Sequence, residues 1–303
     1  MITWAPPTID GSRQMIKAND VTRAGVVGAG TMGNGIAHTF ALHGVHVTLV
    51  DVDKGLLERA LATIEKNLDR QVQKGTCSDS DAVVALQRIE AETSIESLSD
   101  VEVVIEAATE SPALKFELFE LLSSVTAEDA LLATNTSSIS ITEIAARVNE
   151  PSRVIGMHFM NPVPVMQLVE VIRGLETSDG VTKFTMDLCK RVSKVPVLAN
   201  DYPGFVANRV LMPMINEALY CVMEGVAEPD AVDSIMQLGM NHPMGPLALA
   251  DLIGLDTCLA IMEVLHHGLG DSKYRPCPLL RKYVAAGRLG RKSGCGVFEY
   301  RET

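Results

Sequence analysis

His158 and Glu170 are the two residues whose types and spacing most directly indicate chemistry. They lie equidistant from Pro164, on two apolar runs, 153–159 and 167–172, that flank a proline-rich bend. If these runs pair as antiparallel strands about that centre, the two side chains lie opposite each other, with Cβ atoms about 4.5–5.5 Å apart. A carboxylate at that distance can fix the tautomer of the imidazole and raise its basicity, as a general acid/base histidine requires. The same pair could also be a histidine satisfied by a structural carboxylate in a packed hairpin.

A glycine-rich segment near the start of the chain predicts a dinucleotide site. A short buried strand leads into Gly28-Ala29-Gly30-Thr31-Met32-Gly33, and an amphipathic helix and a second strand that ends at Asp51 follow. In this order Gly28 suits the tight turn, Gly30 lets the pyrophosphate approach, and Gly33 lets the helix pack on the strand. The helix N-terminus then faces the phosphates. Because Asp51 can accept hydrogen bonds from a ribose and would repel a 2′-phosphate, NAD is predicted over NADP.

The order of the elements predicts an α/β fold with two domains. Strand-like and helix-like runs alternate over residues 23–200, as in a Rossmann-type doubly wound sheet, whereas residues 201–303 have helical patterns throughout. Residues 1–22 are expected to form a loose N-terminal extension, and Met15 could be the natural start. The segment 246–265 is apolar almost all round, which predicts a helix buried against another helical domain or a partner subunit.

Polar residues that follow strands are further candidates for a ligand site. Glu110 and Lys115 come after the strand-like run 101–108, where doubly wound folds place ligands, although they could equally be charges of a first helical turn. Ser137 follows the next strand and is a candidate ligand-facing hydroxyl, whereas most loop serines only form turns. Asn208 interrupts the apolar lining of the first helix after residue 201. It is either a buried packing group or a ligand donor.

A predicted helix over residues 54–74 carries a basic stripe. Its cations repeat at spacings that place them near one face of the helix, namely Arg59, Lys66, Arg70 and Lys74. On an acidic protein such a stripe could bind a polyanionic ligand. It could equally be a solvated helix face.

Composition limits the other classes of function. The net charge of −12 and the pI near 5.1 argue against a nucleic-acid binder or a protein of the membrane surface. No apolar run reaches the ~18 residues of a transmembrane helix. The six cysteines are scattered without a zinc-like or redox spacing, so reduced thiols in a cytoplasm are expected, and no metal site is predicted.

Taken with their order, the motifs resemble those of the 3-hydroxyacyl-CoA dehydrogenase family, above all its bacterial 3-hydroxybutyryl-CoA members. The resemblance covers about Arg23 to Tyr300. Besides the glycine-rich segment it rests on Asn135-Thr136-Ser137-Ser138, Gly156-Met157-His158-Phe159-Met160-Asn161-Pro162-Val163-Pro164-Val165-Met166, Pro203-Gly204-Phe205-Val206-Ala207-Asn208-Arg209 and Gly290-Arg291-Lys292-Ser293-Gly294.

The resemblance implies NAD-dependent oxidation of an (S)-3-hydroxyacyl-CoA by a homodimer joined through its C-terminal domain. It makes His158 the general acid/base and Glu170 its partner, with Ser137 and Asn208 holding the oxygens of the substrate. The remaining residues that it implies are Glu110, Lys115, Ser137, Asn161 and Lys292 at the cofactor, and Asn67 and Lys74 at coenzyme A. Asn67 stands where the family usually has a serine.

Two other functions fit a dinucleotide domain followed by helices. A β-hydroxyacid dehydrogenase that acts on a free acid would share the two-domain plan, but those enzymes use a lysine where this chain has His158 and Glu170. A non-catalytic, crystallin-like NAD-binding protein could keep the same fold. Loss of the acid/base pair would favour that interpretation, and here both residues are present.

Overall fold

Residues 16–300 are described by the computed structural model. The chain divides into two units, the first ending at Asp201 and the second beginning at Tyr202. Residues 1–15, which make up most of the predicted loose extension and include Met15, lie outside the described residues. Residues 18–21 are folded, since they contain a short 3-10 helix, η1 (Ala18–Asp20), and the side chains of Ala18 and Val21 are buried.

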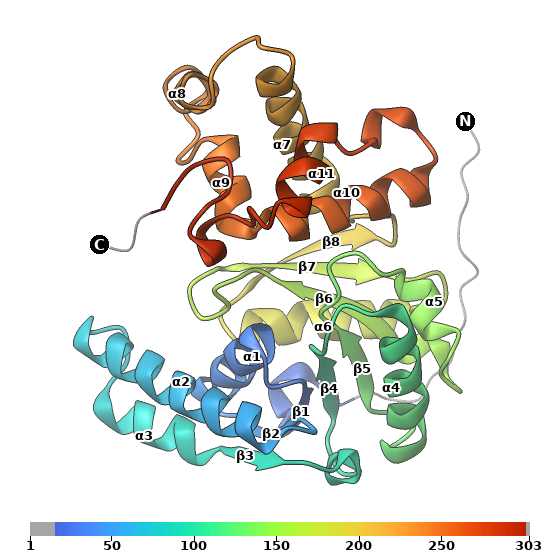
Figure 1. The fold of residues 1–303 in the computed structure, drawn as a ribbon. Helices are drawn as coiled ribbons and strands as arrows, with labels where there is room; N and C mark the ends of the chain where they lie inside the picture. The colour runs from blue at the N-terminus through green and yellow to red at the C-terminus, as the bar shows by residue number, and fades with distance from the viewer. Residues whose placement is uncertain (1–15, 301–303) are drawn as a thin grey trace. The chain divides into compact units, whose positions relative to one another are not determined.

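The first unit is built on one eight-stranded sheet with the order β3-β2-β1-β4-β5-β6-β7-β8 (Figure 1). All neighbouring strands are parallel except β6 and β7, which pair antiparallel. The predicted Rossmann-type α/β fold is therefore confirmed. The strands are β1 (Arg23–Val27), β2 (His46–Val50), β3 (Ile89–Glu92), β4 (Val103–Glu106), β5 (Leu131–Thr134), β6 (Val154–Phe159), β7 (Leu168–Arg173) and β8 (Val195–Asn200).

Successive side chains of a strand point to opposite faces of the sheet. Both faces of this sheet therefore carry apolar side chains, and helices cover both. Val103 and Ile105 join a core with α1, α2, α3 and α6, whereas Val104 lies on the opposite face, and all three are fully buried. Strands buried on both faces are continuously apolar, as the sequence shows. The helices are α1 (Thr31–Leu42), α2 (Lys54–Gln73), α3 (Asp79–Gln87), α4 (Pro112–Val125), α5 (Ile141–Ala145) and α6 (Asp179–Arg191), with the short turns η2 (Ile95–Leu98) and η3 (Pro151–Arg153).

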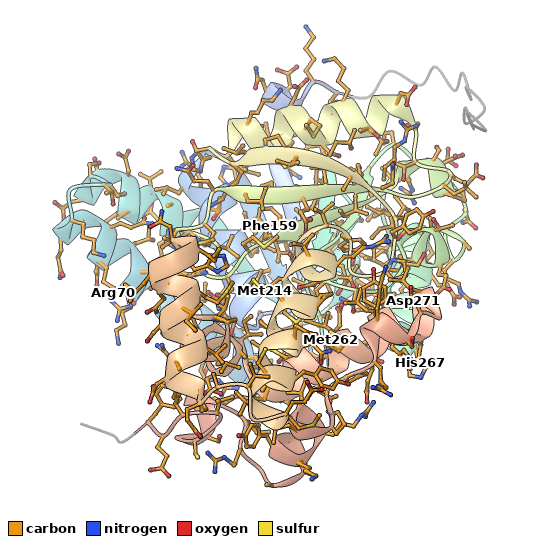
Figure 2. The ribbon with its side chains drawn as sticks, turned by 90° about the horizontal axis from the view of Figure 1, so that it is seen from above. Arg70, Phe159, Met214, Met262, His267 and Asp271 are labelled. Carbon is orange, nitrogen blue, oxygen red and sulfur yellow. The ribbon has the colours of Figure 1, made fainter. Side chains whose placement is uncertain are left out.

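The second unit is helical. Its elements are α7 (Ala207–Met223), α8 (Pro229–Met240), α9 (Pro246–Ile253), α10 (Leu255–Leu269), η4 (Ser272–Tyr274), α11 (Pro278–Ala285) and η5 (Arg291–Ser293). Figure 2 labels Met214 on α7 and Met262 on α10, and Met262 belongs to the core of this unit. Over residues 16–300, no helix combines the length and the apolar character needed to cross a membrane.

The prediction of one helix over residues 246–265 is wrong. The segment forms α9 and α10, which meet at Gly254, where φ is +103°. Only glycine adopts this backbone conformation readily, so the residue ends one helix and turns the chain into the next. Most apolar side chains of both helices, including Leu247 and Leu265, are buried in the core of their own unit or packed against it, whereas Leu252 is 50% exposed.

Candidate functional site

The hairpin of β6 and β7 places His158 opposite Glu170, in the predicted register. The Nδ1 and Oε2 atoms lie 2.8 Å apart, and the two residues are only 9% and 4% exposed. When Glu170 is ionised and His158 is neutral, the imidazole must donate from Nδ1, because the carboxylate can only accept, and its basic lone pair is then on Nε2. The pair thus has the tautomer and the fixed orientation of a general base.

A side-chain bridge connects this hairpin to the loop that follows β5. The amide oxygen of Asn135 accepts a hydrogen bond of 2.8 Å from the backbone N–H of Phe159, the residue after His158. The backbone N–H of Asn135 in turn donates to the carbonyl of Glu106 at 2.7 Å. The ends of β4, β5 and β6 are therefore held in register at the point where doubly wound sheets bind ligands.

A buried carboxylate and a buried ammonium lie beneath this loop. Glu106 is 0% exposed and Lys115 is 1% exposed, and Nζ lies 2.6 Å from Oε1. Glu106 also accepts hydrogen bonds from the backbone N–H of Ala108 and the hydroxyl of Thr134, both at 2.7 Å. Breaking such a pair leaves an uncompensated charge, at a cost of about 3–5 kcal/mol. The pair therefore fixes α4 to the ends of β4 and β5.

Glu110 completes the network and holds the candidate hydroxyl. One of its oxygens, Oε2, lies 3.4 Å from the ammonium of Lys115. The other, Oε1, accepts hydrogen bonds from the hydroxyls of Thr136, Ser137 and Ser138 and from the backbone N–H of Ser137. Burial alone would raise the pKa of Glu110, but Lys115 and these donors hold its pKa below the usual value. The structure thus brings Glu110, Lys115 and Ser137 together.

This network changes the interpretation of Lys115. The residue was predicted to contact the cofactor, yet its ammonium is enclosed by Glu106, Glu110 and the carbonyl of Ala108. In this arrangement Lys115 supports Glu110, and direct contact with a cofactor stays a prediction.

The loop that opens α1 has the geometry of a phosphate-binding turn. Gly28 has a φ of +99°, and a Cβ atom there would lie 2.6 Å from the carbonyl of Ala107. A Cβ atom at Gly33 would lie 1.7 Å from the carbonyl of Gly28, so only glycine allows α1 to approach the strand. A Cβ atom at Gly30 meets nothing within 4 Å, which leaves open space beside the helix N-terminus. Gly28 and Gly33 thus have the geometry predicted for the tight turn and for helix packing, and the approach of a pyrophosphate at Gly30 stays a prediction.

Asp51 stands at the end of β2 and binds the same loop. One carboxylate oxygen accepts from the backbone N–H of Ala29 at 2.8 Å, and the other accepts from that of Asp53 at 3.0 Å. Each carboxylate oxygen can accept a second hydrogen bond, which is the capacity needed for two ribose hydroxyls. The residues present therefore fit a dinucleotide.

The basic stripe lies on α2. Arg70, labelled in Figure 2, and Lys74 are exposed, with Lys74 at the C-cap of the helix. Asn67 is half-buried, and its amide oxygen accepts from Arg70 at 3.4 Å. Arg59 lies 3.9 Å from the carboxylate of Asp53. This exposed, largely cationic face is compatible with a polyanionic ligand.

Three predicted site residues lie outside these clusters. Asn161 is exposed and begins the bend between β6 and β7. Asn208 and Lys292 belong to the second unit, where Asn208 is buried in the first turn of α7 and Lys292 lies 2.6 Å from the carboxylate of Asp256. Their roles toward cofactor and substrate stay predictions.

The sequence interpretation missed Glu106, Thr134 and the side chain of Asn135. Glu106, the second of two acids in the largely apolar run 101–108, was a signal for a buried ion pair, because an unpaired carboxylate is too costly to bury. Thr134 had no comparable signal, since β-branched residues are common in strands.

Comparisons with known proteins agree with this geometry. Residues 23–202 match the 3-hydroxyacyl-CoA dehydrogenase NAD binding domain, and residues 204–300 match the C-terminal domain of the same enzymes. A probable 3-hydroxybutyryl-CoA dehydrogenase of Bacillus subtilis is 57% identical over 91% of this chain and 96% of its own length. A 3-hydroxybutyryl-CoA dehydrogenase of Bradyrhizobium diazoefficiens is 51% identical over 93% of this chain and 96% of its own. The crystal structure of (S)-3-hydroxybutyryl-CoA dehydrogenase PaaH1 from Ralstonia eutropha shares 49% identity and a TM-score of 0.90, covering 93% of this chain and 100% of that one.

Proposed function

The chain belongs to the 3-hydroxyacyl-CoA dehydrogenase family, and we propose that it oxidises an (S)-3-hydroxyacyl-CoA to the 3-ketoacyl-CoA with NAD, and catalyses the reverse reduction. The observation that carries this proposal is the buried hydrogen bond of 2.8 Å between His158 and Glu170. A free-acid dehydrogenase with a lysine base would have no use for that pair. A non-catalytic NAD-binding protein would have no need of it.

In the proposed mechanism His158 acts as general base through Nε2. It accepts the proton of the 3-hydroxyl while Glu170 keeps the ring oriented and stabilises the imidazolium that forms. The Ser137 hydroxyl, which donates to Glu110 at 3.2 Å in this structure, turns to donate to an oxygen of the bound substrate. NAD, when bound, accepts the hydride that leaves C3 of the substrate. In the reduction, the same histidine returns its proton to the oxygen.

The substrate proposal is tested by following NADH oxidation with ketoacyl-CoAs of increasing length. The relatives named for 3-hydroxybutyryl-CoA favour a short acyl chain, so acetoacetyl-CoA is expected to give the highest kcat/KM. Free acetoacetate is the control for a free-acid enzyme. Turnover of the free acid with none of the thioesters would overturn the proposal.

Lys74 is proposed to bind the phosphates of coenzyme A. Changing Lys74→Ala should raise KM for acetoacetyl-CoA about tenfold, since a hydrogen bond to a charged group contributes about 1.5–3 kcal/mol. The second substrate is the acetoacetyl thioester of pantetheine, which lacks those phosphates. Its KM should stay unchanged. Added salt should reduce the difference between the two substrates. Lys183→Ala, on α6 and outside the stripe, is the matched control for loss of one exposed charge. Equal losses with both substrates would assign Lys74 to the structure of α2.

Asp51 is proposed to select NAD over NADP. Its carboxylate would bind the ribose hydroxyls and repel a 2′-phosphate, so the wild type should prefer NADH by about ten- to a hundredfold in kcat/KM. Asp51→Ala should remove most of that preference. Because Asp51 also holds the backbone of the loop, efficiency should fall with both cofactors, and their ratio is the informative measurement. An unchanged ratio would place the selectivity elsewhere.

The proposed assembly is a homodimer joined through the helical unit. Most apolar side chains of α9 and α10 pack in their own unit, so we place the surface for a partner on α8, where Ile235, Leu238 and Met240 are 60%, 88% and 62% exposed, and on the exposed Leu252 of α9. Apolar side chains grouped in this way favour association. Light scattering at micromolar concentration should give the mass of two chains, and the mass of one chain would refute the dimer.

A cytoplasmic location is also proposed. All six cysteines are free thiols, and Cys189, Cys258 and Cys277 are buried, as is usual for proteins of reducing compartments. Fractionation of the source cells should recover the protein with cytoplasmic markers, and recovery with secreted proteins would contradict the proposal.

A further inference from the structure

Residues 160–167 form the bend between β6 and β7, and the buried ammonium of Lys194 donates hydrogen bonds to it. Its Nζ atom donates to the carbonyl oxygens of Val163 at 2.5 Å and Met166 at 2.8 Å, and the residue is 7% exposed. Within the bend itself, the backbone N–H groups of Val165 and Met166 donate to the carbonyl of Pro162. The lysine therefore adds two hydrogen bonds to the turn that the carbonyl of Pro162 closes.

This lysine is an expensive residue to bury. Within residues 16–300 its ammonium has no carboxylate in ion-pairing range, and burial lowers the pKa of Lys194. An ammonium in such a place is destabilising unless its hydrogen bonds are made, and neutral carbonyls replace only part of its hydration. A methionine would fill the same space without the desolvation of a charge, but it would remove the donor that joins the carbonyls of Val163 and Met166.

The same bend rests on the helix that opens the dinucleotide site. A Cβ atom at Gly35 of α1 would lie 2.8 Å from the Cβ atom of Val163, so this glycine allows helix and bend to touch. Near the end of α1, the His43 ring bonds the hydroxyl of Ser193, the residue before Lys194, at 2.9 Å. The bend and the lysine thus share one support, α1, whose N-terminus carries the glycine loop.

We propose that Lys194 is a positioning residue for the reaction. By fixing the bend on α1, it holds the His158–Glu170 hairpin at a set distance from the place where the nicotinamide cofactor binds. The inference rests on the proposed function, since a hairpin without catalysis would need no such distance.

The test is hydride transfer in a single turnover by Lys194→Met, with Lys190→Met as the control. Lys190 lies on α6, is 63% exposed by its side chain and pairs with Asp187 at the surface. The Lys194 variant should lose about 10- to 100-fold in rate, because a misplacement of ~1 Å can cost 10²-fold. Its NADH affinity should stay within about twofold of wild type, and Lys190→Met should transfer hydride normally. Rates are expressed per NADH-binding site, so an unfolded fraction does not count as lost turnover.

A double variant separates positioning from general structural damage. If Lys194 acts through His158, adding Lys194→Met to His158→Gln should cost less than about twofold, because the group being positioned is already gone. Multiplying losses would overturn the inference, and so would a Lys194→Met chain that binds no NADH. Failure of the proposed function looks different: His158→Gln itself would then keep its activity. An inactive His158→Gln beside a fully active Lys194→Met would reject the inference alone.

Discussion

His158→Gln is expected to lower kcat by about 10²–10⁴-fold while NADH binding stays nearly unchanged, because it removes only the group that exchanges a proton with the substrate. This loss corresponds to about 3–5 kcal/mol of activation barrier. Glutamine has a similar reach and can still bond Glu170, so the hairpin should keep its register. The substrate KM should change little, since the lost interaction develops mainly in the transition state.

The measurement is steady-state and single-turnover oxidation of NADH with acetoacetyl-CoA, beside fluorescence titration of NADH. His46→Gln is the matched control, because that histidine is exposed on β2 and contributes nothing to the proposed site. It should keep the wild-type rate. A His158→Gln enzyme with more than a tenth of the wild-type kcat would show that another group moves the proton.

The hairpin could be predicted because its information is local. Two short apolar runs and a proline-rich bend define both strands, and the centre of the bend determines which residues face each other. Since side chains in a strand alternate with a period of two, a slip of one residue would send His158 to the opposite face. The burial of both faces leaves little freedom for such a slip, and His158 pairs with Glu170 as expected.

The support around the hairpin could not be predicted in the same way. Lys194 binds carbonyls 31 and 28 residues earlier in the chain, and backbone carbonyls carry no signal in the sequence. Glu106 gave a hint as an acid in an apolar strand, but its choice of Lys115 depends on how α4 packs on the sheet. Buried charges are decided by tertiary contacts, which periodicity does not contain.

The break at Gly254 shows another limit of periodicity. The apolar pattern continues through residues 246–265 because both α9 and α10 face the same core, so the pattern alone predicts one helix. A glycine inside a helix costs only about 1 kcal/mol relative to alanine, which is too little to predict a break. The positive φ of Gly254 becomes visible only with the backbone.

Glu170→Gln is expected to cost nearly as much as loss of the histidine, although the imidazole remains. A glutamine amide can donate to Nδ1, which would then carry the lone pair and leave Nε2 protonated as the wrong tautomer for a base. In serine hydrolases, the corresponding change of aspartate to asparagine costs about 10⁴-fold for this reason. We therefore expect hydride transfer to fall by about 10²–10⁴-fold with NADH affinity unchanged.

Two measurements test that explanation together. Nitrogen NMR of labelled histidine should show His158 protonated at Nδ1 in the wild type and at Nε2 in Glu170→Gln. The rate is measured beside it as single-turnover oxidation of (S)-3-hydroxybutyryl-CoA by both enzymes, the direction in which His158 accepts the proton. Glu176→Gln removes an exposed carboxylate that follows the same strand, and should change neither the rate nor the tautomer. Loss of rate with the wild-type tautomer would mean that Glu170 acts by its charge on the imidazolium. A normal rate with the altered tautomer would remove His158 from the proton transfer, because a ring protonated at Nε2 cannot accept the hydroxyl proton there.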